Sequence, residues 1–438
     1  MSTKASLILL LVICGVIGML RGDFSCGKLA ATQKTEISFW NGFTGPDGRV
    51  MLEMIREFNE KNPDINVTMQ RIPWALYYNK VMVSGLDDRG PEVFVIHASA
   101  LTRMHRAGIL ANENSLFEGP KAIPISDFDP YVLDQTLFGQ NHFAVPLDIH
   151  PQGMYCNAEM LKKIGMVNAD GSAHPPENRE EFLKAAHAMM EPKGSDHPDV
   201  FGYALTAWQN NFQCLMAQFD GRYLDENGKC VLNDPNNIKA LEFMASLRDK
   251  EKLIPPPDNQ LGWVGYRQKK VGMVWDGVYM LGDLLRLQGL DYVGAPIPTI
   301  GNHSGTLADS HCLCLKANLT PKQRAAGERF IQFLSANSLK WAAAGQVPAR
   351  ISVRAKPEFA KMQVQSAFAK QIPWMKYPPR ITTLFEMGIE INLAVEKVIR
   401  GRSTAKEALD IANENAQKAM DRDEETQKNA KLSQAVKK

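Results

Sequence analysis

The sequence predicts an α/β protein made of two units, and three observations lead to this fold class. The chain has 438 residues, more than one compact core usually holds. Strand-like and helix-like patterns alternate along both halves. The segment between the two halves is residues 144–157 (AVPLDIHPQGMYCN), which contains Asp148, His150, Pro146 and Pro151. Because proline lacks a backbone donor, we expect an extended segment that leaves one sheet, crosses a gap and enters another, rather than one long central strand.

The first half alternates in the order β-α-β-α-β. Strands and helices, told apart by the spacing of their apolar residues, are expected at residues 36–40, 50–58, 65–69, 74–85 and 92–96. This order implies a largely parallel sheet with helices on both faces. Ligand groups in such sheets lie at the C-terminal ends of the strands. The ends concerned are residues 40–44, 72–74 and 97–99.

The second half repeats the alternation. Helices are expected at residues 179–190, 235–253 and 321–334, and strands at 202–206, 271–275 and 310–315. Asn233 or Asp234 caps the helix that starts with Pro235. From residue 383 onward the chain is expected to be mostly helical.

Composition excludes some classes of function. The net charge is +2 and 22% of the residues are charged, which is ordinary for a globular protein. No Lys/Arg block interleaved with aromatics is present, so nucleic acid is not an expected partner.

The N-terminus predicts export. Lys4 precedes an uncharged apolar run at residues 5–20, which suits the core of a secretory signal better than a membrane span. We expect residues 1–32 to be a signal or anchor segment. Lipidation at Cys26, cleavage after Ala31 and an uncleaved anchor remain open alternatives. The rest of the chain is expected to be exported and soluble.

The five cysteines that follow the expected signal or anchor segment predict neither a disulfide framework nor a zinc site. Their number is odd and no CxxC occurs, so buried free thiols are expected. A Cys214–Cys230 bridge stays open. The nine histidines are scattered, and we expect no metal and no cofactor.

The sequence lacks the signatures of common enzymes. It has no P-loop, no GxGxxG after a strand, no HExxH and no GxSxG. A glycosidase-type pair of carboxylates stays open, because Asp and Glu are plentiful. Beside an export signal and two α/β units, this lack favours a binding protein over an enzyme.

Aromatic and polar residues gather at the ends of the expected strands. They are Trp40, Trp208, Trp275, Tyr279, Asp148, His150, Asp276 and His311. Aromatic faces accept the C–H face of a sugar ring, and charged or amide groups bond its hydroxyls. Any one of these residues could equally be a core aromatic or a turn-forming acid. Their repetition in both halves favours a binding site.

Several segments together resemble a known family. They are FWNGFTGPDGRVMLEMIREFNEKNPDINV (39–67), PEVFVIHASALTRMHRAGIL (91–110), AVPLDIHPQGMYCNAEML (144–161), FDGRYLDENGKCVLNDPNNIKALEFM (219–244), KKVGMVWDGVYM (269–280), SHCLCLKAN (310–318) and AAGQVPARISV (342–352). In their order and spacing they resemble the extracellular solute-binding proteins of bacterial ABC sugar importers, the group that includes maltodextrin-binding proteins. Cys156 stands where a Tyr is common.

The resemblance implies a fold of two α/β lobes with a hinge at the crossing. Each lobe would be a mixed, mostly parallel sheet flanked by helices, as in periplasmic binding proteins. Lobe one would span residues 33–147 plus 305–350, and lobe two 148–304 plus 351–438. A solute between the lobes would favour the closed state.

The resemblance also implies a set of ligand-binding residues. They are Trp40, Asn41, Thr44, His97, Asp148, His150, Trp208, Asp276, Gly277, Tyr279, His311 and Arg350, with Asp148 and Trp208 foremost. Trp74 and Trp374 are secondary candidates, for which packing against a helix is an equal alternative.

The expected function is capture of a mono- or oligosaccharide and its delivery to the membrane permease subunits of an ABC importer. A monomer in the periplasm, or anchored on the extracytoplasmic face, is expected. Alternatives are another polar solute, such as a polyol or a glycerophosphoester, and an exported carbohydrate-active enzyme. The pair Tyr77 and Tyr78 is similar to that of iron-binding relatives, but it falls early in an expected helix.

Overall fold

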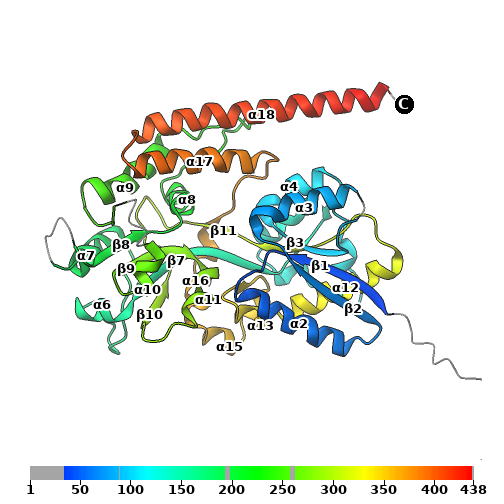
Figure 1. Ribbon diagram of the computed structural model, residues 1–438, viewed down its shortest axis with the longest axis horizontal. Coiled ribbons are helices and arrows are strands. Elements are labelled where there is room, and N and C mark those ends of the chain that lie inside the picture. The colour runs from blue at the N-terminus through cyan, green and yellow to red at the C-terminus, as the bar shows by residue number, and fades with distance from the viewer. Residues whose placement is uncertain (1–33, 88, 193–197, 257–261, 437–438) are drawn as a thin grey trace, which may run out of the picture.

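The protein has two lobes that lie side by side, each with its own sheet and helices (Figure 1). The computed structural model describes residues 34–436 apart from 88, 193–197 and 257–261. The expected signal or anchor segment, with Cys26, falls outside the described residues. Among the helices that are described, none combines the length and apolarity needed to span a bilayer.

The first lobe is built around a five-stranded sheet in the order β2-β1-β3-β12-β6. Its elements are β1 (Thr35–Asn41), α2 (Asp47–Lys61), β2 (Ile65–Arg71), α3 (Trp74–Leu86), β3 (Val93–His97), α4 (Ala98–Arg106), α5 (Pro130–Leu133), β4 (Leu137–Phe138), β5 (Asn141–His142), β6 (Val145–Pro146), β12 (His311–Leu315), α12 (Pro321–Ala336) and α13 (Ser338–Ala342). Strands β1, β2 and β3 are parallel, as predicted, whereas the returning strand β12 is antiparallel to both of its neighbours.

Alternation along β1 decides which core each of its side chains enters. Ile37 and Phe39 face one side, where the Phe39 ring lies 5.2 Å from Phe330 of α12. Trp40 points to the other side and joins the core beneath α3. There the hydroxyl of Tyr77 donates to the Trp40 carbonyl over 2.8 Å.

The second lobe holds a larger mixed sheet in the order β14-β11-β7-β9-β8, with β10 and β13 also paired to β7. Its elements are β7 (Asp148–Asn157), α6 (Ala158–Lys163), α7 (Arg179–Met189), β8 (Phe201–Leu205), α8 (Trp208–Gln218), α9 (Pro235–Asp249), α10 (Gly262–Arg267), β9 (Val271–Gly277), α11 (Leu281–Leu284), β10 (Tyr292–Ala295), β11 (Thr306–Asp309), β13 (Val347–Pro348), α14 (Ile351–Arg354), α15 (Pro357–Ala360), α16 (Gln363–Ala369), β14 (Met375–Lys376), α17 (Leu384–Ile399) and α18 (Ala405–Val436).

Strand β7 corrects one expectation. The chain does pass from β6 in the first sheet to β7 in the second, but β7 is a ten-residue strand, buried along its whole length, at the centre of its sheet. Pro151 is tolerated because it falls where β13 has ended, at Ile149, and β9 has not begun, at Gln152. Only β11 pairs with the strand at Pro151, so the missing backbone donor can affect one ladder at most.

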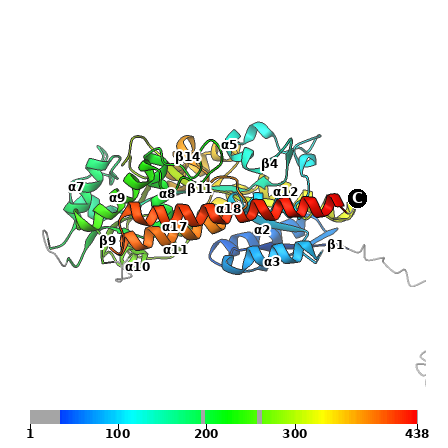
Figure 2. The same ribbon diagram turned by 90° about the horizontal axis from the view of Figure 1, so that it is seen from above.

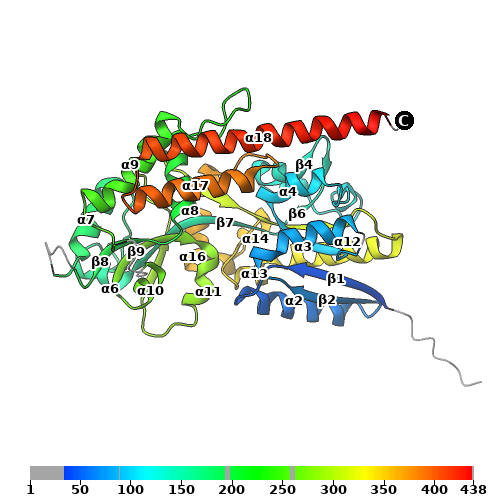
Figure 3. The same ribbon diagram turned by 45° about the horizontal axis from the view of Figure 1, so that its top comes forward.

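Three stretches of chain meet at the junction of the lobes. Strand β7 leaves the first lobe, β11 runs antiparallel beside it and returns to β12, and β13 pairs with its first two residues. Figure 3 shows β7 running from the first lobe into the second sheet. Such side-by-side crossings form a hinge that can bend without separating the sheets.

The C-terminal helices cover the second lobe and reach the first. Helices α17 and α18 pack on each other and on α9, and α17 also packs on α8. Helix α18 extends along the top of the molecule over both lobes (Figures 1 and 2). Asp423 of α18 forms an ion pair with Arg106 of α4, with the two groups 2.6 Å apart. The mostly helical end predicted by the sequence is confirmed.

Buried thiols are also confirmed. Cys156, Cys214, Cys230, Cys312 and Cys314 are all free and buried. Cys214 and Cys230 therefore do not form a bridge in this structure.

Glu113 provides a test of the packing of the first lobe. Oε1 of its carboxyl group accepts the Leu315 amide over 2.6 Å, and burial raises the pKa of Glu113 to about 8. The folded state thus holds a proton that the unfolded state releases above its ordinary pKa of 4.5, so stability falls as the pH rises from about 5 to 8. We expect Glu113→Gln to remove this fall, which amounts to at most about 4 kcal/mol. Urea unfolding at pH 5.5 and 8.5 measures it.

The exposed neighbour Glu118 offers the control. Glu118→Gln should leave the pH dependence as it is in the wild-type protein. If the free energy of unfolding fell equally with pH in Glu113→Gln and in the wild-type protein, the buried, protonated state of Glu113 would be contradicted.

Candidate ligand-binding cleft

A cavity of about 440 Å³ lies between the two lobes. Its lining comes from the loop after β1, the ends of β3 and β11, the first half of β7, the starts of α3 and β12, and four further stretches at residues 210, 279, 344–346 and 378. The lining residues are Gly42, Thr44, Gly45, Pro46, Asp47, Trp74, His97, His150, Gln152, Asn210, Tyr279, Leu307, Ala308, Asp309, His311, Ala344, Gln346 and Pro378.

The loop after β1 forms one wall because it fits closely against Trp74. A Cβ on Gly42 would lie 2.1 Å from the indole ring, so only glycine allows this approach. The Trp74 ring then stacks on His311, with centroids 5.7 Å apart and planes 16° from parallel. From the second lobe Tyr279, 40% exposed, lies opposite, its ring 6.4 Å from that of His150.

A buried carboxylate lies behind this wall. Asp148, the first residue of β7, is fully buried. Its Oδ1 accepts the backbone amide of His311 over 2.9 Å and Nδ1 of His150 over 3.3 Å. Its Oδ2 accepts Nδ1 of His311 over 2.7 Å and the indole Nε1 of Trp341 over 2.6 Å. One side chain thereby fixes both imidazole rings.

The charges in this cluster follow from burial and contact. Burial alone would raise the pKa of Asp148, but the charges and hydrogen bonds of His311 and His150 outweigh it and hold the pKa far below its usual range. Burial lowers and Asp148 raises the pKa of His311, with a net rise. Burial, with His311 and His150 nearby, keeps the pKa of His97 well below its ordinary value, so that ring is neutral at pH 7.

Five of the predicted residues line the cavity, and so does one secondary candidate. They are Thr44, His97, His150, Tyr279, His311 and Trp74. They come from both lobes and from chain segments far apart in sequence. Their role in binding remains a prediction.

Other predicted residues lie elsewhere. Trp40 is in the core under α3, because its position in the alternation of β1 turns it away from the cavity. Asn41 is buried at the end of β1, where its Oδ1 accepts the Phe43 amide over 3.1 Å and shapes the loop. Asp148 lies behind the histidines and orients them, so its expected direct contact with a ligand is corrected to a positioning role.

Three more expectations need correction. Asp276 is buried beneath Tyr279 and accepts the Gly277 amide over 2.7 Å. Position 277 has to be glycine, because an added Cβ would lie 2.0 Å from the Tyr279 ring. Arg350 pairs with Asp127 over 2.6 Å, an ion pair that ties β13 and α14 to the first lobe rather than facing the cavity.

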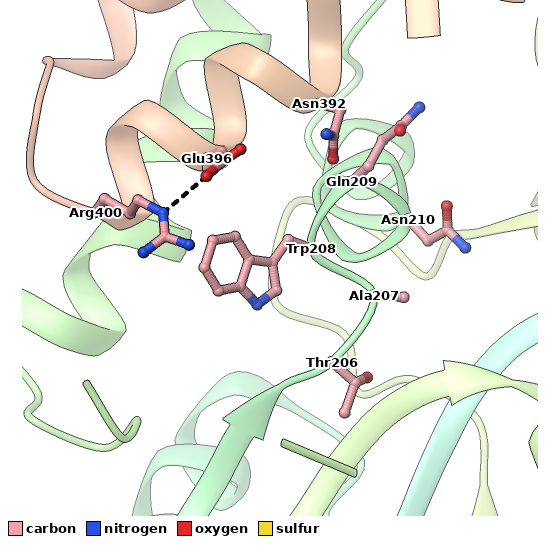
Figure 4. Close-up of a pocket in the computed structure, with 8 residues that line it drawn as sticks. All are labelled: Thr206, Ala207, Trp208, Gln209, Asn210, Asn392, Glu396 and Arg400. Atoms are coloured by element: carbon pink, nitrogen blue, oxygen red, sulfur yellow. Dashed lines mark hydrogen bonds and ion pairs between the residues drawn. The ribbon is translucent and has the colours of Figure 1, made fainter. Parts of the chain in front are cut away.

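Trp208 lines a second, neighbouring hollow of about 440 Å³ (Figure 4). This hollow lies between the start of α8 and helix α17, where the Arg400 guanidinium is 5.6 Å from the indole centroid. Asn210 lines both this hollow and the cavity between the lobes. Trp374 lines yet another hollow, beside β10 and α16.

Sequence reasoning missed several polar lining residues. They are Asp47, Gln152, Asn210, Asp309 and Gln346. Gln152 lies two residues after His150 in the crossing stretch, and side-chain alternation along a strand could have placed both on one face. Asp47, Asn210 and Gln346 have no local signal, because loops and helix starts have no fixed alternation, and Asp309 ends the short strand β11, which the sequence analysis did not predict.

The Asp148 network predicts a large loss of stability on Asp148→Asn. Each carboxylate oxygen accepts from two donors, so either orientation of an amide sets its NH₂ against N–H groups. We expect the free energy of unfolding to fall by about 3 kcal/mol or more. Urea titration followed by far-UV circular dichroism measures it.

Asp291→Asn is the matched control, because Asp291 forms an exposed ion pair with Lys162 over 3.5 Å. Its effect should stay within about 0.5 kcal/mol. Equal effects of the two substitutions would show that Asp148 does not hold the junction.

Comparison with known proteins places this architecture. One curated relative is the arabinooligosaccharide-binding protein of Bacillus subtilis (strain 168), 24% identical over 269 residues, which are 58% of this chain and 56% of the relative. This chain thus matches only about half the length of that relative.

Solved structures with the same fold cover almost the whole chain. A Listeria monocytogenes ABC substrate-binding protein in complex with cycloalternan has a TM-score of 0.76 at 20% identity, covering 89% of this chain and 99% of that one. The maltose/maltodextrin-binding domain from Bdellovibrio bacteriovorus, bound to maltotriose, has a TM-score of 0.74 at 18% identity, covering 88% and 100%. These likenesses show the two-lobe periplasmic-binding-protein fold.

A family model gives the assignment. The model described as a bacterial extracellular solute-binding protein matches residues 53–365, well over half of the chain. Together with the two lobes and the cavity between them, this match shows that the chain belongs to the family of bacterial extracellular solute-binding proteins.

Proposed function

We propose that the protein captures a sugar or an oligosaccharide between its lobes and delivers it to the permease subunits of an ABC importer. The observation that carries the proposal is the pair of aromatic walls, Trp74 from the first lobe and Tyr279 from the second, on one cavity. An aromatic face accepts the apolar face of a sugar ring, and a ring on each lobe gains its contact only when both lobes approach the ligand.

The polar groups of the cavity suit hydroxyls. Thr44, Gln152, Asn210 and Gln346 are neutral and can both donate and accept hydrogen bonds. No Lys or Arg occurs among the described residues that line the cavity. A phosphate group would lack a cationic partner there, so a neutral sugar fits better than a glycerophosphoester.

Binding is coupled to hinge closure at the three crossings. A ligand that contacts both lobes favours the closed state by the energy of the contacts that only this state makes. Reversing the populations almost completely takes about 5.5 kcal/mol, which ring stacking on two walls and several desolvated hydrogen bonds supply.

The hollow of Trp208 extends the proposed site for longer chains. It adjoins the cavity through Asn210, and its indole face offers a further platform (Figure 4). The relatives support this proposal, because the Bacillus protein is named for arabinooligosaccharides, the Bdellovibrio domain for maltose and maltodextrin, and the Listeria protein is in complex with cycloalternan. We infer that the protein acts outside the cytoplasm as a monomeric binding protein, not as an enzyme.

A thermal-shift screen against mono- and oligosaccharides, polyols and glycerophosphoesters tests the proposal. We expect a sugar to raise the melting temperature of the wild-type protein and Trp74→Ala to weaken its binding at least tenfold, since stacking on one wall is lost. Trp208→Ala should weaken longer sugars more than short ones. Isothermal titration with the sugar found in the screen measures both effects.

Trp374→Ala is the matched control, because Trp374 is half-buried as Trp74 is but lines a different hollow. It should bind the sugar like the wild-type protein. A shift with polyols or glycerophosphoesters alone would refute the sugar. Release of product from a glycan mixture would refute a pure binding role.

A further inference from the structure

Three histidines from distant parts of the chain converge in the cavity. They are His97 at the end of β3, His150 in β7 and His311 at the start of β12. The ring centroids lie 4.6 Å apart for His150 and His311, 4.7 Å for His97 and His311, and 5.2 Å for His97 and His150. One ring nitrogen of each lies within 4.8 Å of the other two.

The second nitrogen of each ring is already held by the protein. The carboxylate of Asp148 accepts hydrogen bonds from Nδ1 of both His150 and His311, and the hydroxyl of Tyr78 contacts Nδ1 of His97. A carboxylate that accepts from Nδ1 fixes the tautomer whose lone pair is on Nε2. Metal-binding histidines are oriented in this way, by a carboxylate or another oxygen on the nitrogen that does not bind the metal.

Three imidazole nitrogens, one from each ring, fit a single small cation. Bonds of about 2.0–2.1 Å to a tetrahedral ion place ligand nitrogens about 3.3 Å apart. Starting from separations of no more than 4.8 Å, each ring has to move inward by about 1 Å or less, a change that side-chain torsions can supply. Because all three rings line the cavity, a fourth ligand can approach only from the cavity side.

We propose that His97, His150 and His311 bind one divalent transition-metal ion of the Zn²⁺ type through their Nε2 atoms, with the fourth coordination position open to the cavity. Three histidines with one open position are the donor set of zinc sites that bind an exchangeable oxygen ligand. Water fills that position in the free protein, and an oxygen of the captured solute replaces it. Only this last replacement rests on the proposed function; the metal site rests on the histidines.

Zinc titration of chelator-treated protein tests the site directly. We expect one equivalent of Zn²⁺ to bind to the wild-type protein, and His97→Ala and His150→Ala to weaken that binding more than about 100-fold, beyond the usual cost of losing an outer partner. The matched control is His174→Ala, because His174 is a half-buried histidine that contacts Asn168 and does not line the cavity. It should leave the affinity unchanged.

The visible absorption of bound Co²⁺ reports the coordination geometry of the ion, which a loss of packing in a variant cannot produce. Co²⁺ bound to the wild-type protein should show the strong visible absorption of a four-coordinate site, and one equivalent of Zn²⁺ should abolish it. Thermal melts in chelator identify variants that are folded, so that a loss of binding reports the removed ligand.

The outcomes separate this site from the sugar proposal. Absence of a one-equivalent site, a weak six-coordinate Co²⁺ spectrum, or unchanged zinc affinity in folded His97→Ala and His150→Ala would overturn the metal site. A sugar-induced thermal shift in excess chelator, with no zinc binding, would leave the sugar proposal standing with the imidazoles as hydrogen-bonding groups. Zinc binding without any sugar-induced thermal shift would support the metal site and contradict the sugar proposal.

Discussion

The fold depends on the buried carboxylate of Asp148, where all three crossings of the chain meet. Asp148 begins β7, its backbone pairs with Pro348 of β13, and its side chain holds His311 of the returning segment and Trp341 of α13. A buried charge is tolerated only with full hydrogen bonding, so the carboxylate requires these partners in their places. The junction is therefore stiff at one point, while the strands around it can bend.

The same constraint shapes the binding surface. Asp148 fixes the rings of His150 and His311, and His311 in turn supports the Trp74 ring by stacking. The stacking wall of the first lobe is thus set by a group at the hinge itself. Tyr279 belongs to the other lobe, so the two walls can approach each other only through motion at the crossings.

The cavity combines two chemistries that suit a hydroxylated ligand. Aromatic faces and neutral amides suit the body of the proposed sugar, and three imidazoles present nitrogen atoms at one side of the same space. A cation there would polarise and orient one oxygen of the solute, which adds direction to contacts that stacking alone leaves loose. Selectivity among sugars would then depend on which hydroxyl reaches the imidazoles.

The sequence by itself determined the elements of the fold, because the alternation of side chains and the helical spacing are local properties. It placed α7, β9 and α12 within a few residues of their observed bounds. Only the tertiary structure decided the site. Trp40 and Trp74 both stand where a strand ends or a helix begins, yet the face of β1 turns Trp40 into the core, whereas the close approach of Gly42 sets Trp74 in the cavity. His97, His150 and His311 meet only because β3, β7 and β12 come together at the junction, and contacts between such distant residues leave no periodic trace in the chain.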